Sequence, residues 1–370
     1  MTDGPAKRPH RANHAERIAP SILTAKGSLV KHLPRLLGAT ALAVALAACG
    51  TPEAATGNLT IGNCGEDLRF PSPAQRLFVN DGNLISMVLA LGAQDQVAAV
   101  SSVQRDADTL RRHYGEAVDG LNSVAPEYPS RETVLAQRPD VMVAGWNYGY
   151  SESTNLTPDS LRADGIAAYT LTESCRQRDG EKTRGVTDPW TALNADLTNL
   201  GAITGRADRA TELTTDIDRR LAALRAAPQP DRRPTIFLFD SASDTIYSSG
   251  KFGAPQAILE SAGARNALED VADTWTAVSW ERLAAADPDA IMFVDYPPQT
   301  FQQKLDLLRA KPGMDRLRAV TEGRFLNLPY ALWTSGPLNI DAAEQIRAQL
   351  ERWNLVPSST VRPTSDDTVR

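Results

Sequence analysis

The chain has 370 residues, enough for two domains, and carries 39 Lys and Arg against 45 Asp and Glu. Without the N-terminal segment 1–48, discussed next, 32 basic and 43 acidic residues remain, a net charge of about −11. Such an acidic chain excludes functions that need a continuous basic face, nucleic-acid binding above all.

The N-terminal segment has the parts of a bacterial lipoprotein signal peptide. Residues 1–35 are basic, and residues 36–48 form an uncharged apolar run that is too short to span a bilayer, which needs about 20 residues. The run ends in Leu46-Ala47-Ala48-Cys49, which matches the lipobox. A buried helix with an ordinary cysteine is the alternative. We predict a signal peptide over residues 1–48 and an exported protein held on the outer face of the cytoplasmic membrane by a lipid on Cys49.

A linker and leading segment, residues 49–75, precedes a first α/β lobe over residues 76–187. Strands alternating with helices indicate a parallel sheet covered by helices. Apolar runs predict strands at 76–80, 96–100, 140–145 and 167–171, and helices at 84–91 and 133–137.

Residues 188–230 have no strand pattern and predict a helical connector. Asp188-Pro189 is a typical helix start, and a second helical run over 206–225 is about 30 Å long. A second α/β lobe follows over 231–356, and the polar residues 357–370 are expected to be disordered. In this lobe we predict strands at 235–239, 245–248, 290–294 and 324–328, and helices at 255–262, 301–308 and 341–353.

Two cysteines follow the lipobox, Cys64 and Cys175. Outside the cytoplasm such a pair predicts a disulfide, which would stabilise the fold by roughly 4–5 kcal/mol because it closes a loop of about a hundred residues. Two free thiols or a metal-binding pair are the alternatives.

Both lobes contain the same short pattern, which indicates an internal repeat. Residues 130–140 and 279–289 each read Ser-x-Glu, a short helix, and Pro-Asp before an apolar strand. Glu132 and Glu281 each stand seven residues before the proline. Two related lobes around a connector predict a cleft.

On these patterns, from about residue 76 to residue 350, the chain resembles the substrate-binding lipoproteins of ABC importers for iron-siderophores, haem and cobalamin. These are class III periplasmic binding proteins with a helical backbone. The resemblance implies an α/β fold of two Rossmann-like lobes joined by a long backbone helix, with little hinge motion. It also implies that Glu132 and Glu281 dock onto arginines of the permease. For each glutamate the alternative is a favourable interaction with its own helix dipole.

The ligand site is expected beyond the carboxyl ends of the strands, where open α/β sheets bind their ligands. The loops at these ends are rich in aromatic residues, which suit a bulky rigid ligand, and Arg105 and Lys251 could pair with an anionic chelate. Packing is the alternative for any single Trp, and a solvated position is the alternative for Lys251. The predicted ligand-binding residues are Asn80, Asp81, Arg105, Trp146, Tyr148, Lys251, Phe252, Trp275, Tyr296, Tyr330 and Trp333.

We predict no resident metal or cofactor and no enzymatic activity. His113 is the only histidine after residue 48, and we expect it at the surface, whereas sites for bare zinc or manganese need several imidazoles. The sequence has no nucleophile elbow, zinc-protease motif or phosphate loop. Asp240 and Asp244 could form a glycosidase pair, but they read as turn and loop acids.

The leading hypothesis is a monomeric solute-binding lipoprotein that captures an Fe(III)-siderophore and delivers it to an ABC permease. Within the same class, cobalamin, haem or another large cofactor precursor is the alternative ligand. Alternatives of other classes are an exported α/β hydrolase and a structural or signalling lipoprotein that keeps the fold without transport.

Overall fold

The computed structural model describes residues 57–178 and 180–369. The predicted signal peptide and the lipidation site Cys49 lie outside the described residues. Among the helices of the described part, none combines the length and the apolar character needed to cross a membrane.

The described chain begins with a β-hairpin that the sequence analysis treated as a leading segment. Strands β1 (Gly57–Asn63) and β2 (Glu66–Ser72) pair antiparallel around a two-residue turn. Cys64 and Gly65 in this turn have φ of 51° and 84°, which is typical of tight hairpins. The predicted disulfide is confirmed, because Cys64 is bonded to Cys175 and so ties the hairpin to the rest of the N-terminal lobe (residues 57–187).

The N-terminal lobe is built on a parallel sheet with the strand order β5-β4-β3-β6, and β7 and β8 both pair with β6. Leu77 and Val79 face one apolar core, whereas Phe78 between them faces another, so both faces of the sheet are buried. The strands are β3 (Leu77–Asn80), β4 (Val97–Ser101), β5 (Ser123–Ala125), β6 (Val141–Trp146), β7 (Gly149–Tyr150) and β8 (Ala167–Thr170), and the helices are α1 (Gly82–Ala90), α2 (Ala107–Tyr114), α3 (Arg131–Ala136) and α4 (Pro158–Ala163).

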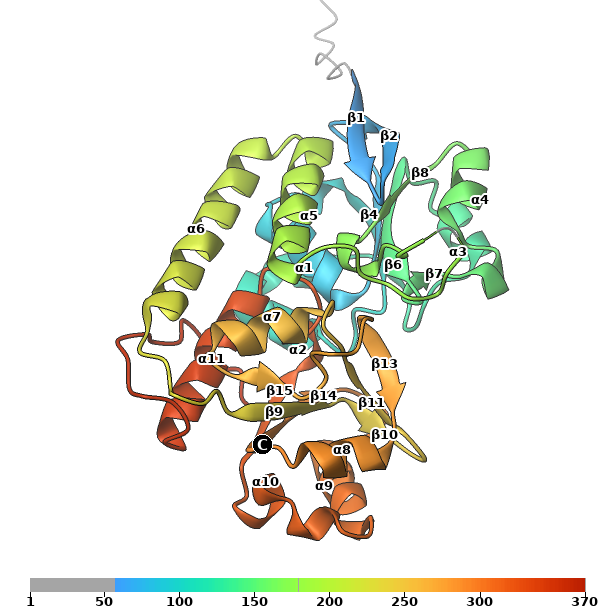
Figure 1. Cartoon of the computed structure of the whole chain (residues 1–370). Coiled ribbons are helices and arrows are strands. Elements are labelled where there is room, and N and C mark those ends of the chain that lie inside the picture. The colour runs from blue at the N-terminus through green and yellow to red at the C-terminus, as the bar shows by residue number, and fades with distance from the viewer. Residues whose placement is uncertain (1–56, 179, 370) are drawn as a thin grey trace, which may run out of the picture. The chain divides into compact units, whose positions relative to one another are not determined.

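The connector consists of α5 (Pro189–Thr204) and α6 (Ala207–Ala226), which lie side by side (Figure 1). Asp188 caps α5 by accepting a hydrogen bond from the backbone N–H of Thr191 (3.0 Å), and Gly205 ends the helix in the left-handed conformation with φ of 68°. The connector therefore contains a long helix, α6, as the resemblance implied, preceded by a second helix.

The C-terminal lobe (residues 231–369) has a parallel sheet with the order β12-β9-β14-β15 and an antiparallel sheet β10-β11-β13. Helices α7 and α11 cover one face of the parallel sheet, and α8, α9 and α10 cover the other (Figure 1). The strands are β9 (Thr235–Phe239), β10 (Ser241–Ala242), β11 (Ile246–Ser249), β12 (Arg265–Asn266), β13 (Trp275–Val278), β14 (Ala290–Asp295) and β15 (Phe325–Pro329), and the helices are α7 (Ala254–Ser261), α8 (Trp280–Ala286), α9 (Phe301–Ala310), α10 (Arg318–Thr321) and α11 (Asn339–Arg352).

The sequence repeat corresponds to a repeated structural unit. Ser130 caps α3 and Ser279 caps α8. The Asp of each Pro-Asp pair then holds the start of the neighbouring strand. Asp140 accepts hydrogen bonds from the backbone N–H groups of residues 75 and 76 (2.6 and 3.0 Å), and Asp289 accepts one from that of Thr235 (2.8 Å).

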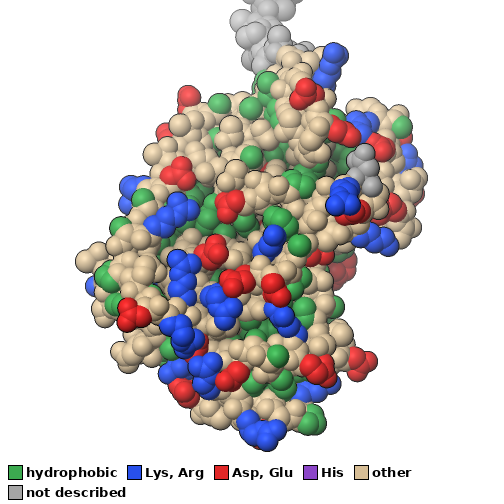
Figure 2. Space-filling model, in the orientation of Figure 1, with side chains coloured by type: hydrophobic (Ala, Val, Ile, Leu, Met, Phe, Trp, Pro, Cys, Tyr) green, Lys and Arg blue, Asp and Glu red, His purple; other side chains and the backbone are tan. Residues whose placement is uncertain are grey.

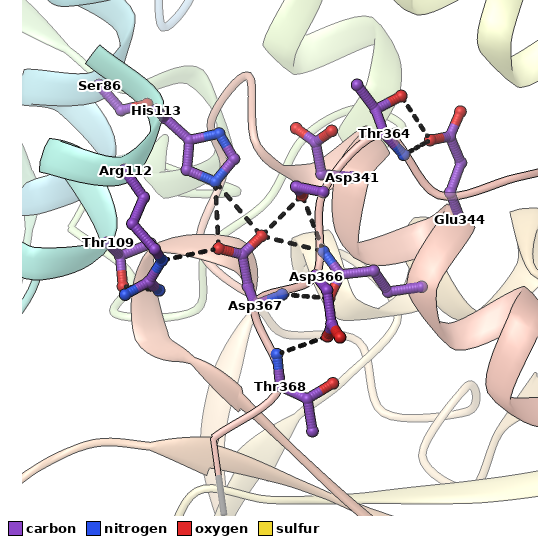
Figure 3. Close-up of polar contacts among 12 residues, drawn as sticks. Ser86, Thr109, Arg112, His113, Asp341, Glu344, Thr364, Asp366, Asp367 and Thr368 are labelled. Atoms are coloured by element: carbon purple, nitrogen blue, oxygen red, sulfur yellow. Dashed lines mark hydrogen bonds and ion pairs between the residues drawn. The ribbon is translucent and has the colours of Figure 1, made fainter. Parts of the chain in front are cut away.

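The C-terminal tail is described up to residue 369 and differs from the disorder expected for residues 357–370. Asp367 is only 4% exposed and accepts a hydrogen bond from Gln345 of α11 (3.0 Å). Both of its carboxylate oxygens lie 3.3 Å from His113 Nε2 in α2 (Figure 3). His113 is therefore half-buried and paired with a carboxylate, not a free surface residue. Disorder was predicted from the polar composition of the tail. Composition does not reveal its partners, because His113 lies 254 residues earlier in the chain and Gln345 lies on α11.

Candidate ligand-binding site

A cavity of about 170 Å³ lies where the two lobes meet. Three of its tyrosines come within two residues of the end of a parallel strand, Tyr148 after β6, Tyr296 after β14 and Tyr330 after β15. The cavity therefore lies at the carboxyl ends of the strands, as the sequence analysis expected. It is lined by Tyr128, Asn147, Tyr148, Arg184, Asp240, Ser241, Tyr247, Trp275, Tyr296, Tyr330 and Thr334.

Aromatic rings form most of the cavity wall. The Tyr296 and Tyr330 ring centroids are 4.6 Å apart, and Tyr247 stacks on Trp275 at 6.2 Å. Tyr128 and Tyr247 are 41% and 38% exposed and are two of the three large apolar or aromatic side chains that remain exposed among the described residues. Exposed aromatic groups that gather at one cavity are typical of a binding surface.

Arg105, which follows β4, places a positive charge beside this aromatic wall. Its guanidinium donates a hydrogen bond to the Tyr296 hydroxyl and lies 4.8 Å from the centroid of the same ring. Its side chain is 10% exposed, and its Nε and Nη2 have no hydrogen-bond partner among the described residues. Arg105 is not itself among the residues that line the cavity, but its unpartnered donors lie behind the Tyr296 and Tyr330 rings that do.

Asp81 holds Arg105 in place and does not line the cavity. One oxygen of its carboxylate accepts a hydrogen bond from the backbone N–H of Gly82 (2.8 Å), and the other lies 4.0 Å from Arg105 Nη2. Asp81 has φ of 76°, a conformation that non-glycine residues rarely adopt and that often marks functional sites. Burial raises its pKa, and the positive charge of Arg105 partly offsets that effect.

Two residues of the N-terminal lobe reach across to the C-terminal lobe beside the cavity. Glu173 accepts a hydrogen bond from the backbone N–H of Ala254 (3.0 Å), and Arg184 donates one to the backbone oxygen of Trp275 (2.5 Å). Arg184 Nε also lies 3.8 Å from Asp273. Burial raises the pKa of Glu173 to about 7. These contacts join the lobes at one wall of the cavity.

Several predicted site residues lie outside this cavity. Trp146 lines a second cavity of about 470 Å³, where its ring lies 3.8 Å below the Arg176 guanidinium. Lys251 is exposed, Phe252 is half-buried outside the cavity, and Trp333 is fully buried in the core because residues 330–335 pack under α1. Asn80 is buried and donates a hydrogen bond to the backbone oxygen of Tyr148 (2.9 Å), so it positions the neighbouring loop.

The second cavity is larger, but the smaller one is the better candidate. Every residue of the larger cavity lies between positions 63 and 186, within one lobe and beside the disulfide. The smaller cavity combines both lobes, and four predicted residues meet there: Tyr148, Trp275, Tyr296 and Tyr330.

Other residues of the cavity were not among the predicted ligand-binding residues. Tyr128, Asn147 and Asp240 come soon after β5, β6 and β9, so the carboxyl-end rule could have selected them. Tyr247 lies on a strand of the antiparallel sheet, and Arg184 lies in an irregular segment that no motif marks. Asp240 and Asp244, treated alike from sequence, differ here, because Asp240 is 4% exposed at the cavity and Asp244 is exposed.

The two glutamates predicted to dock the permease occupy equivalent places in the two lobes. Glu132 is in the first turn of α3 and Glu281 in the first turn of α8, and both are exposed. Hydrogen bonds lower the pKa of both carboxyl groups. Glu132 accepts them from its own backbone N–H and from the Ser130 hydroxyl, and Glu281 accepts its main one from the Ser279 hydroxyl. Both are therefore ionised at neutral pH. Their docking role stays a prediction.

Two related α/β lobes, a helical connector and an aromatic cavity between the lobes define a two-lobed solute-binding protein. The sequence profile of the periplasmic binding protein family matches residues 81–332, and the chain belongs to this family. Its members are the extracytoplasmic solute-binding components of ABC importers, and the predicted resemblance to class III and the predicted fold class are confirmed. Comparison with curated proteins gives no match.

Solved structures of similar proteins cover most of the chain. A periplasmic binding protein from Veillonella parvula has 22% identity and a TM-score of 0.67, covering 80% of this chain and 98% of its own. An ABC-type Fe3+-hydroxamate transport protein from Saccharomonospora viridis has 25% identity and a TM-score of 0.65, covering 79% and 98%. A periplasmic haem-binding protein from Pseudomonas aeruginosa has 25% identity and a TM-score of 0.58, covering 80% and 99%.

Proposed function

We propose that this protein captures a ferric siderophore outside the cytoplasm and delivers it to an ABC permease, with a lipid on Cys49 holding it at the membrane. The observation that carries the ligand class is the aromatic cavity between the lobes, because its Tyr296 and Tyr330 rings lie beside the guanidinium of Arg105, which has donors without a hydrogen-bond partner. The similarity to the Saccharomonospora viridis protein, whose description names Fe3+-hydroxamate, supports the same class.

The chemistry of the cavity suits an oxygen-coordinated iron chelate. Such a ligand is bulky, rigid and rich in oxygen atoms, so it gains contact area on the Tyr and Trp rings and hydrogen bonds from Arg105. Burial raises the pKa of Tyr296 to about 12, so its hydroxyl stays neutral and can itself hydrogen-bond at neutral pH. The cavity of about 170 Å³ is smaller than the roughly 300–1,000 Å³ typical of drug-sized ligands. It would therefore receive one end of the chelate.

Haem is the second candidate ligand. The observation that favours it is the aromatic surface that Tyr296, Tyr330 and Trp275 contribute to the cavity, and the Pseudomonas aeruginosa protein is described as haem-binding. Cobalamin, also expected from the sequence resemblance, remains in the same group of large ligands.

The test is direct binding to the purified protein. Tryptophan fluorescence and isothermal titration calorimetry would be run with a ferric trihydroxamate, a ferric triscatecholate, haem and cobalamin. We expect saturable binding of a ferric siderophore, with quenching because Trp275 lines the cavity. Saturable binding of haem or cobalamin alone would replace the siderophore proposal, and binding of none of the four would contradict it.

A further inference from the structure

Asp240 is part of the wall of the cavity between the lobes. It directly follows β9 in the C-terminal lobe, and its side chain lines the cavity between the lobes. The residue is 4% exposed, and its backbone N–H donates a hydrogen bond to the backbone oxygen of Tyr247 (3.1 Å). This bond fixes the backbone from which the carboxylate projects.

The carboxylate of Asp240 has no hydrogen bond from any described residue, and its Oδ1 is fully buried. Buried Asp81 and Asp106 also have one unpartnered oxygen each, but the other oxygen of each accepts a backbone hydrogen bond. Asp196 accepts hydrogen bonds from a tyrosine and a threonine hydroxyl (2.7 and 2.6 Å). A buried acceptor without a partner costs about 1–3 kcal/mol, and more when it is charged, so such groups require an explanation.

No neighbouring cation in the described part of the chain donates a hydrogen bond to Asp240. Lys304 is fully buried, but its ammonium donates to the backbone oxygens of Val294 (2.5 Å) and Tyr296 (3.3 Å) and not to Asp240. Burial raises the pKa of Asp240 to about 6, and the charges of Lys304 and Arg105 limit that rise. At neutral pH the cavity thus contains an ionised carboxylate without a bonded partner.

The rest of the cavity suits a cation beside Asp240. Aromatic faces attract cations, and Tyr247, Trp275 and Tyr296 line the same space. Arg184 also lines it, but the charge of Arg184 is balanced by Asp273 at 3.8 Å and its Nη2 is bonded to Trp275. A chelate that is anionic throughout would instead bring negative charge against Asp240.

We propose that Asp240 is a specificity-determining residue that binds a terminal ammonium on the ligand, so that the preferred ligand is a ferric hydroxamate with a cationic arm. The arm would enter the cavity and bond Asp240, and the iron-bearing hydroxamate oxygens would lie toward the spare donors of Arg105. This inference rests on the proposed function and names the ligand class of the same site.

The experiment compares two chelates with the same iron centre, a linear ferric trihydroxamate with a terminal ammonium and its N-acetylated form. Calorimetry on the purified protein should show the ammonium form bound at least about tenfold more tightly, as expected for a charge-assisted hydrogen bond. Asp240→Asn should reduce this preference to about twofold or less by weakening only the ammonium form. Asp244→Asn removes an exposed acid of the adjacent turn and should leave the preference unchanged.

The remaining outcomes separate a failure of the Asp240 role from a failure of the proposed function. Equal binding of the two forms by the unaltered protein, or a preference that survives Asp240→Asn, would overturn the role of Asp240 and leave the proposed function standing. Binding of a triscatecholate but of neither hydroxamate would do the same. Binding of no ferric chelate would overturn both.

Thermal unfolding should show Asp240→Asn at least as stable as the unaltered protein, because it removes an unpaired buried charge. If Asp240→Asn lowered the affinity for the ammonium and the N-acetylated chelate equally, with its stability unchanged, the proposal would also be contradicted.

Discussion

Glu173 of the N-terminal lobe accepts a hydrogen bond from the backbone N–H of Ala254, the first residue of α7 in the C-terminal lobe, at 3.0 Å. The residue before α7 is Gly253, which has no side chain to cap the helix, so the other lobe supplies the acceptor. One continuous apolar core, which includes Val79, Leu197 and Leu238, also runs through both lobes and the connector. The lobes are therefore joined by both polar and apolar contacts beside the cavity.

Glu173→Gln should make the stability of the protein less dependent on pH. Burial raises the pKa of Glu173 to about 7, well above its value of about 4.3 in an unfolded chain, so the folded state binds the extra proton. The free energy of unfolding should therefore fall as pH rises from about 4.5 to 7, by up to about 1.4 kcal/mol per pH unit for this group, and level off above that. Urea unfolding of the Gln variant should show a shallower slope in this window, whereas Glu212→Gln, at an exposed position, should not. Equal slopes for Glu173→Gln and the unaltered protein would contradict the assigned burial.

Arg105→Met should weaken binding of a ferric trihydroxamate by about 10- to 100-fold, because the ligand would lose a charged hydrogen-bond donor. Arg105→Lys should recover only part of the affinity, since an ammonium cannot reproduce the fork of guanidinium donors. Calorimetry measures both, with Arg309→Met at an exposed position of α9 as the control. Unchanged affinity in Arg105→Met would place the chelate elsewhere.

Loss of the Cys64–Cys175 disulfide should reduce the free energy of unfolding by roughly 4–5 kcal/mol, because the bond closes a loop with a sequence separation of 111 residues. Denaturant unfolding of the double variant Cys64→Ser/Cys175→Ser is the measurement. Reduced unaltered protein should behave like the double variant. An oxidised protein no more stable than either would show that the bond does not constrain the unfolded chain.

Charge reversal at Glu132 and Glu281 should impair transport without impairing ligand capture. Both side chains are exposed in the first turns of equivalent helices, one on each lobe. We expect the double variant Glu132→Arg/Glu281→Arg to lower cellular uptake of the labelled chelate by about tenfold or more, since like charges would face the arginines proposed on the permease. Binding by the purified variant should not change, and Glu212→Arg should leave uptake intact. Normal uptake in the double variant would favour the helix-dipole explanation of these glutamates.

Asp367→Asn should destabilise the protein at neutral pH and much less in acid. Burial alone would raise the pKa of Asp367, but hydrogen bonds from His113, Ser365 and Gln345 outweigh it and hold the pKa below its usual value. The stabilisation is therefore present above about pH 4 and is lost as the pH falls further. Urea unfolding at pH 7 should show a loss of about 1–3 kcal/mol for Asp367→Asn and little for the exposed neighbour in Asp366→Asn. A constant loss down to pH 3 would contradict a charge-based role.

The amino-acid sequence by itself determined the features that depend on local pattern. The strand at residues 235–239 and the helix at 301–308 are recognisable because apolar residues recur with the period of a strand or a helix, whichever element later packs on them. The repeat around Glu132 and Glu281 and the positions of Tyr148, Tyr296 and Tyr330 after strands follow from the same local order.

Only the tertiary structure decided which of these residues meet and which charges are paired. Trp146 and Tyr148 stand two positions apart, yet they line different cavities. Asp240 is buried and unpaired while Asp244 is exposed, and the polar tail is held by Asp367 on His113. Burial and pairing depend on partners brought from distant parts of the chain, and a local pattern carries no information about those partners.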